Sequence, residues 1–202
     1  GEPSYFWIFQ QLLHPVAMAV ILPLYNRANL GKLVLWVLQK LKLLSFPVYP
    51  EEKQGLKPKD FPKKMPNALA ELALAQLDKL EEFEKKRKEI SKIYEKELQG
   101  LEEKGYLKRV AKFNSLKVSW LRYSILVEKP DELRKFAKKR SIILGNWYSN
   151  VIDPKGTDFQ KINYKQSFSS SQKGSCPKAE EIAGKIVNLP TYPRMKMDDA
   201  YK

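Results

Sequence analysis

The sequence predicts an α+β fold in which an apolar helical hairpin precedes a small domain of helices and mostly antiparallel strands. The first forty-five residues are nearly uncharged, with apolar side chains at helical spacing. A long helical pattern follows, and after residue 100 short runs of β-forming residues alternate with helical segments. We therefore expect a hairpin or insertion at 1–45, a Pro-rich linker at 46–66 and an α+β domain at 67–202.

The chain is strongly basic. Its 202 residues carry 37 Lys and Arg against 23 Asp and Glu, and residues 101–202 alone hold 21 basic and 11 acidic residues. A diffuse positive field fits an acidic small molecule, such as a nucleotide-linked sugar. Nucleic acid is not the expected partner, because the sequence has neither an RRM-like aromatic signature nor a GxxG loop in a KH-like setting.

Cysteine and histidine are scarce. The single cysteine, Cys176, excludes a disulfide framework and a Cys-based zinc cluster, and the single histidine, His14, excludes a two-His metal site. We expect no metal site and a reducing, cytoplasmic setting.

The hairpin segment has two interpretations. No residue between Glu2 and Arg27 is formally charged at pH 7, so this stretch is long enough to span a bilayer. Five residues argue against a clean span: Gln10, Gln11, His14, Pro15 and Pro23. With a second apolar helix from Leu30 to Leu44, the segment forms either a hairpin packed on protein or an interfacial membrane patch. We favour packing on protein, which the prolines and glutamines tolerate better, and association of residues 4–44 with a membrane surface stays open.

The elements of the α+β domain follow from the sequence pattern. Asn67 is a good N-cap and Gly100 a good stop, so one long helix is expected between them. The charged face of that helix is interpreted as solvated. The expected later elements are strands at Tyr106–Phe113, Lys117–Val127 and Ile142–Leu144, helices at Pro130–Arg140 and from Pro177 to about Asn188, and the start of one more helix at 198–202.

Three segments resemble a known family. They are the run from Lys64 through Pro66 and Asn67 to Leu77, the segment from Pro130 through the loop Gly145-Asn146-Trp147-Tyr148, and Cys176–Glu181 with Asn188–Thr191. In this order they resemble the C-terminal part of DegT/StrS-type sugar aminotransferases, which are PLP-dependent enzymes of aspartate-aminotransferase fold. Residues 4–50 look like an insertion that some members carry.

The resemblance implies a C-terminal domain that completes the substrate cleft of an aminotransferase for a nucleotide-linked keto-sugar. Its implied partners are the large PLP-binding domain of the same protein and a second copy in a homodimer. The family's catalytic lysine follows an S-x-x-K run in that large domain, and no such motif occurs here. We therefore expect no catalytic residue in this chain, and neither activity nor bound pyridoxal 5'-phosphate for the chain alone.

Few residues qualify for the binding site. Lys64 replaces the arginine of the family's Arg-Met pair, so the resemblance makes it the candidate contact to the cofactor phosphate. Asn146, Trp147 and Tyr148 are the candidate substrate residues, because they leave a strand end for a loop. The alternative for this loop is an aromatic corner packed under the sheet. The alternative function is a non-catalytic interaction module, with residues 4–44 on a membrane surface.

Overall fold

The computed structural model describes residues 1–25, 29–45, 48–59, 61–110, 118, 120–147, 150–154, 156–166 and 174–201. The chain divides into two compact units, Gly1–Asp78 and Lys79–Lys202, and each is described by itself. The first contains α1 (Tyr5–Leu24), α2 (Leu30–Lys40), a short 3-10 helix η1 (Glu52–Gln54) and α3 (Asn67–Leu77). The second contains α4 (Leu80–Glu97), α5 (Gln99–Glu103), β1 (Lys108–Arg109), β2 (Tyr123–Leu126), α6 (Pro130–Lys139), α7 (Pro177–Lys185), β3 (Ile186–Leu189) and the 3-10 helix η2 (Met197–Tyr201).

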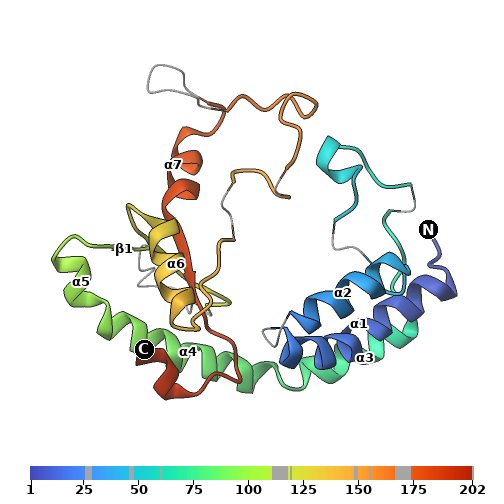
Figure 1. Ribbon diagram of the computed structural model, residues 1–202, viewed down its shortest axis with the longest axis horizontal. Helices are drawn as coiled ribbons and strands as arrows, with labels where there is room; N and C mark the ends of the chain where they lie inside the picture. Colours follow the sequence, from blue (N-terminus) through green and yellow to red (C-terminus); the bar gives the residue numbers. More distant parts are fainter. Residues whose placement is uncertain are drawn as a thin grey trace. The chain divides into compact units, whose positions relative to one another are not determined.

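Helices α1 and α2 form the expected hairpin (Figure 1). The hydroxyl of Ser4 caps α1 by accepting a hydrogen bond from the Trp7 backbone N–H at 3.2 Å. The backbone of α2 lies close to the C-terminal end of α1 at Gly31, where an added Cβ would lie 2.5 Å from the Ile21 carbonyl oxygen and 2.6 Å from the Tyr25 nitrogen. Only glycine fits between the two backbones at this point. The buried centre of the hairpin consists of Ala17, Ile21 and Leu44.

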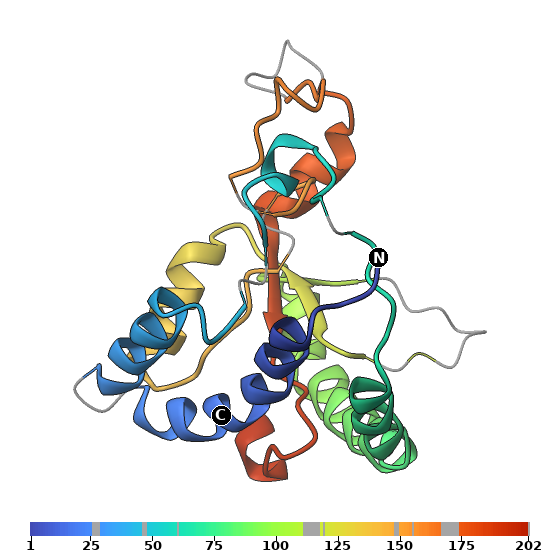
Figure 2. The same ribbon diagram turned by 90° about the vertical axis from the view of Figure 1, so that its right-hand side faces the viewer.

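The second unit has a three-stranded antiparallel sheet in the order β1-β2-β3. Ile125 of β2 stands opposite Val187 of β3, and both are buried against Ile90 and Tyr94 of α4. Leu133 of α6 packs on the same cluster, so α4 and α6 cover this face of the sheet. In Figure 2, β3 follows directly from α7 and the chain then turns into η2. The predicted α+β class, with helices on a small antiparallel sheet, is confirmed.

The predicted long helix is interrupted. Asp78 and Lys79 form a turn between α3 and α4, and Leu98 separates α4 from α5. Neither interruption contains glycine or proline, so the sequence carried no signal for them. The first break coincides with the division between the two units.

Two predicted elements differ from the structure. Ile142–Leu144 is not a strand: Ile143 is 72% exposed, and only the next residue, Gly145, forms a bridge to Asn188. The helix predicted to reach Asn188 ends at Lys185, because Ile186–Leu189 pairs with β2 instead. This tertiary pairing overrides the local helical pattern.

Three other predicted elements differ from the structure in length or in type. In the described residues, the first predicted strand is confined to β1 and the second to β2. Residues 111–117 and 119, part of both predictions, lie outside the described residues. The helix expected at the C-terminal end is a single 3-10 segment, η2.

Candidate functional site

The loop that begins at Gly145 is fixed to the sheet by one asparagine. Gly145 and Asn188 exchange backbone hydrogen bonds of 2.9 and 3.1 Å. The Asn188 amide donates to the Trp147 carbonyl at 3.1 Å, while its side-chain oxygen accepts from the Ser124 hydroxyl at 2.8 Å. Asn188 is only 3% exposed, so this network holds the loop from within the sheet.

The outer side of this loop presents a cation on an aromatic ring. The guanidinium carbon of Arg122 lies 4.0 Å from the centre of the Trp147 ring, a distance typical of cation–π stacking. Trp147 is 54% exposed and Asn146 is exposed, so neither side chain is packed under the sheet. Tyr148, the third predicted substrate residue, lies outside the described residues. A stacked guanidinium, an indole and an amide together can bind a planar or anionic group.

Sequence reasoning missed Arg122 and Asn188 as parts of this site. Arg122 lies in a segment interpreted only as a strand, and Asn188 in one interpreted as the end of a helix. Asn188 is 64 residues away from Ser124 in the sequence, so only the β2–β3 pairing brings these two partners together.

Lys64 lies in the first unit, on an exposed surface. Its ammonium group pairs with the carboxylate of Glu2, and both side chains are 73% exposed. The ammonium group of Gly1 donates to the nearby Pro62 carbonyl at 2.6 Å, which holds the chain start beside this segment. Such an exposed ion pair is weak, so the Lys64 ammonium stays exchangeable.

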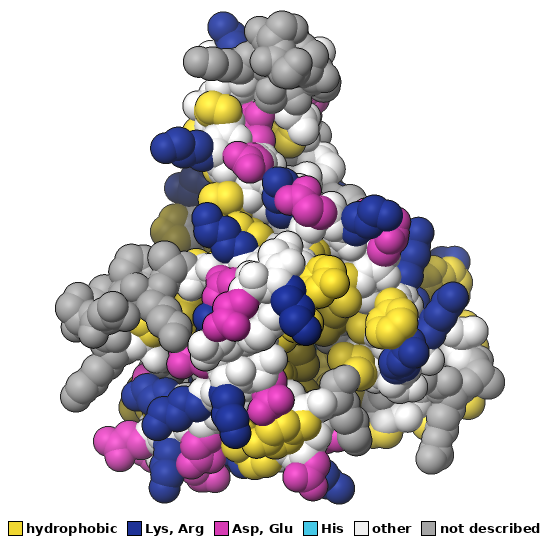
Figure 3. All heavy atoms as spheres, turned by 90° about the vertical axis from the view of Figure 1, so that its left-hand side faces the viewer, with side chains coloured by type: hydrophobic (Ala, Val, Ile, Leu, Met, Phe, Trp, Pro, Cys, Tyr) yellow, Lys and Arg dark blue, Asp and Glu magenta, His cyan; other side chains and the backbone are white. Residues whose placement is uncertain are grey.

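An apolar groove of about 650 Å³ lies in the second unit, between α4 and α5, α6, the sheet and η2. Its floor includes Tyr94, Ile125 and Leu133, and charged side chains such as Glu97 and Arg140 stand at its edge. Figure 3 shows apolar side chains gathered in a hollow with charged ones around it. The groove suits apolar side chains better than a nucleotide sugar.

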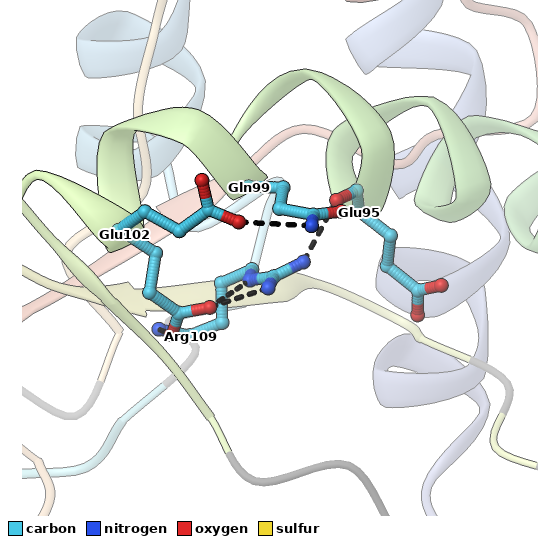
Figure 4. Close-up of polar contacts among 5 residues, drawn as sticks. Glu95, Gln99, Glu102 and Arg109 are labelled. Atoms are coloured by element: carbon cyan, nitrogen blue, oxygen red, sulfur yellow. Dashed lines mark hydrogen bonds and ion pairs between the residues drawn. The ribbon is translucent and has the colours of Figure 1, made fainter.

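A partly buried arginine, Arg109, joins β1 to α4 and α5 (Figure 4). The Arg109 guanidinium pairs with the Glu102 carboxylate and donates to the Glu95 carbonyl at 2.7 Å, and the Arg109 backbone N–H donates to Glu102 at 2.8 Å. Donation of a hydrogen bond to the Glu102 carboxylate raises the pKa of Arg109 above its usual range. Because these donors are directed at protein acceptors, we assign the cluster a structural role.

Three tyrosines, Tyr94, Tyr123 and Tyr164, have raised pKa values, and two of these values are about 12. Burial raises the pKa of Tyr94 to about 12, and the same value holds for Tyr164, through desolvation and its 2.7 Å hydrogen bond to Glu180. A phenol with such a pKa stays protonated near neutral pH, so neither residue serves as a general base there. Among the described residues, no group of three His, Cys, Asp or Glu side chains could hold a metal ion.

The sequence of this chain matches the model of one protein family. The model of the DegT/DnrJ/EryC1/StrS aminotransferase family matches residues 47–202. Among solved structures, the chain is similar to a DegT DnrJ EryC1 StrS aminotransferase from Brucella abortus, with 22% sequence identity and a TM-score of 0.45. That match covers 62% of this chain and 31% of the solved one. No curated protein matches the chain.

Proposed function

Because this chain belongs to the DegT/DnrJ/EryC1/StrS aminotransferase family, we propose that it is the C-terminal domain of a PLP-dependent aminotransferase that acts on a nucleotide-linked keto-sugar. Pyridoxal phosphate would supply the electron sink that transamination requires. In this proposal the chain completes the substrate cleft and contributes to a homodimer in the cytoplasm.

The described residues of this chain do not by themselves fit the cofactor. A cofactor-linked lysine must present its amine inside a pocket. Lys64 is exposed and paired with Glu2, and Lys129, the lysine that lines the groove, is paired with Glu132 at 3.1 Å. We therefore place the cofactor on a large domain of the same protein, and we expect the chain alone to be inactive.

The observation that best supports substrate binding by this chain is the loop held by Asn188, with Arg122 stacked on Trp147. A guanidinium binds phosphate oxygens through paired N–H donors, and an exposed indole can stack on a base or a sugar face. This combination fits the diphosphate end or the planar base of a sugar nucleotide. Asn146 adds an exposed amide for a sugar hydroxyl.

The test compares the product of the complete gene with this chain. Cofactor content is measured by visible absorbance and by whether borohydride fixes the cofactor to the protein, and transamination is assayed with nucleotide-linked keto-sugars. We expect cofactor and activity in the complete product and neither in the chain alone. Stoichiometric cofactor binding by the chain alone, or a complete product without cofactor, would overturn the proposal.

Variants of the complete protein test the loop. Arg122→Gln and Trp147→Ala should raise KM for the sugar nucleotide about tenfold, while cofactor content stays unchanged. The matched control is Arg134→Gln, because Arg134 donates to Asp131 and to the Ile186 carbonyl, away from the loop. A KM change in the control as large as in the loop variants would show that folding, not substrate contact, is responsible.

A further inference from the structure

The first helix has its polar and apolar sides reversed relative to a surface helix of a soluble protein. Its exposed stripe is wholly apolar and follows the spacing of one helix face: Tyr5, Phe9, Leu12, Val16 and Val20. Its two glutamines instead bond the segment that follows α2. Gln10 donates to the Lys42 carbonyl, and Gln11 donates to the Ser45 hydroxyl at 2.9 Å. A surface helix normally turns its polar side chains outward.

This arrangement removes the sequence-based reason for preferring a protein partner. That preference rested on the glutamines and prolines of α1. Both glutamines are satisfied inside the hairpin, and Pro15 and Pro23 lie within one continuous helix. The exposed residues of α1 are therefore all apolar, which favours contact with hydrocarbon.

The second helix adds exposed apolar residues and cations. Leu33, Trp36 and Val37 are exposed on α2. The ammonium group of Lys40 lies 4.7 Å from the centre of the Trp36 ring, and that of Lys32 lies 5.5 Å from the centre of the Tyr25 ring. Aromatic rings beside lysines are typical of the membrane–water boundary. No acidic residue occurs between Glu2 and Glu51, so the charge of the hairpin is only positive.

We propose that the α1–α2 hairpin docks on the surface of an anionic lipid bilayer, with the exposed stripe of α1 inserted among the acyl chains. Charge complementarity argues for this occupant, because an all-cationic hairpin fits anionic headgroups. The hairpin lies along the surface rather than across the bilayer. Among the described residues, α1 is the one helix long and apolar enough to cross a membrane. The 11-residue α2 reaches only about 16 Å, short of the roughly 30 Å hydrocarbon core.

The test is cosedimentation of the chain with vesicles of phosphatidylcholine alone and of phosphatidylcholine mixed with phosphatidylglycerol. We expect stronger binding to the mixture, and a loss of that advantage as salt is added. These comparisons need no variant, so they hold even if a variant fails to fold. Equal binding to both vesicle types, or no binding to either, would overturn the proposal.

Two double variants separate the contribution of the lysines to vesicle binding from that of the apolar stripe. Lys32→Gln with Lys40→Gln should lower the partition coefficient on the mixed vesicles by up to about 25-fold, since each lysine contributes about fivefold, and should leave binding to neutral vesicles unchanged. Phe9→Ser with Val16→Ser should lower the partition coefficient on the mixed vesicles by at least about tenfold. All four side chains are exposed, so folding should persist.

The matched control is Leu121→Ser with Ile143→Ser, which removes two apolar side chains of the second unit that are at least as exposed as Phe9 and Val16. This control should bind vesicles as the unchanged chain does. A comparable loss of binding in the control would contradict docking through the hairpin.

The alternative occupant of the exposed stripe is a second copy of the chain. That alternative would hold if the chain does not bind vesicles and forms a dimer, and if the double variant Phe9→Ser with Val16→Ser dissociates this dimer. Neither result depends on transamination, so this proposal and the proposed function fail separately.

Discussion

The hydroxyl of Tyr94 in α4 donates a hydrogen bond to the Pro190 carbonyl, 2.8 Å away, directly after β3. The ring of Tyr94 also packs 5.4 Å from that of Tyr123 in β2. The buried side chain of Tyr94 therefore joins α4 to β2 and to the end of β3.

Replacement of this tyrosine by phenylalanine tests that connection. Tyr94→Phe keeps the ring but leaves the Pro190 carbonyl without this donor, so the free energy of unfolding should fall by about 0.5–1.5 kcal/mol. The measurement is the denaturant midpoint at neutral pH. Tyr106→Phe is the control, because Tyr106 is 70% exposed and should change stability by less than about 0.5 kcal/mol.

Alkaline pH should destabilise the protein through the same residue. Burial raises the pKa of folded Tyr94 from 10.0 to about 12. Between these values the unfolded chain loses the phenolic proton while the folded chain keeps it, so stability falls as pH rises from about 10 to 12. Denaturation at a series of pH values should show a shallower decline for Tyr94→Phe than for the unchanged chain. Identical slopes would show that Tyr94 ionises in the folded protein as it does in the unfolded one.

The Arg109 cluster should be sensitive to a conservative change. Arg109→Lys keeps the charge but cannot donate to Glu102 and to the Glu95 carbonyl at once, and the Arg109 side chain is only 13% exposed. We expect a loss of about 1–3 kcal/mol in the free energy of unfolding. Lys129→Gln, which breaks the exposed pair with Glu132, should cost less than about 1 kcal/mol. Equal losses would contradict the structural role assigned to the cluster.

Local signals predicted part of this fold well. The helix from Pro130 was predicted because proline opens it, acids follow, and Lys138 and Lys139 close it, and α6 has nearly those bounds. β3 was predicted wrongly as helix, because Ile186–Leu189 continues an apolar pattern without glycine or proline. Its strand conformation comes from pairing with β2, which lies about sixty residues earlier.

The candidate site was predictable only where its residues adjoin in sequence. Asn146 and Trp147 were predicted from their place after an apolar run, although that run is not a strand. The role of Asn188 depends on Ser124 and on the Gly145 bridge, two contacts that no local pattern encodes. Arg122 stacks on a ring 25 residues further along the chain, a contact that depends on tertiary structure.

Gly31 should tolerate no side chain. Alanine is the better helix former, yet its Cβ would lie 2.5–2.7 Å from backbone atoms of Ile21 and Tyr25. Gly31→Ala should therefore destabilise the hairpin by about 1–3 kcal/mol, seen as faster hydrogen exchange in α1 and α2. The control is Gly184→Ala in α7, where a Cβ meets nothing within 4 Å, and which should be neutral or stabilising. Unchanged exchange in Gly31→Ala would contradict the close approach of the two helices.

Asn188 should control the position of the loop that we propose contacts substrate, and two variants distinguish this role from simple stability. Asn188→Ala removes the donor to the Trp147 carbonyl and the acceptor for Ser124, whereas Ser124→Ala removes only the second contact. Both should lower the free energy of unfolding by about 1 kcal/mol, because each leaves a partly or fully buried polar group without its hydrogen-bond partner. In the complete protein, only Asn188→Ala should also raise KM for the sugar nucleotide, since only this change frees the loop that carries Trp147. If Ser124→Ala raised KM equally, lost sheet stability rather than loop position would explain both variants.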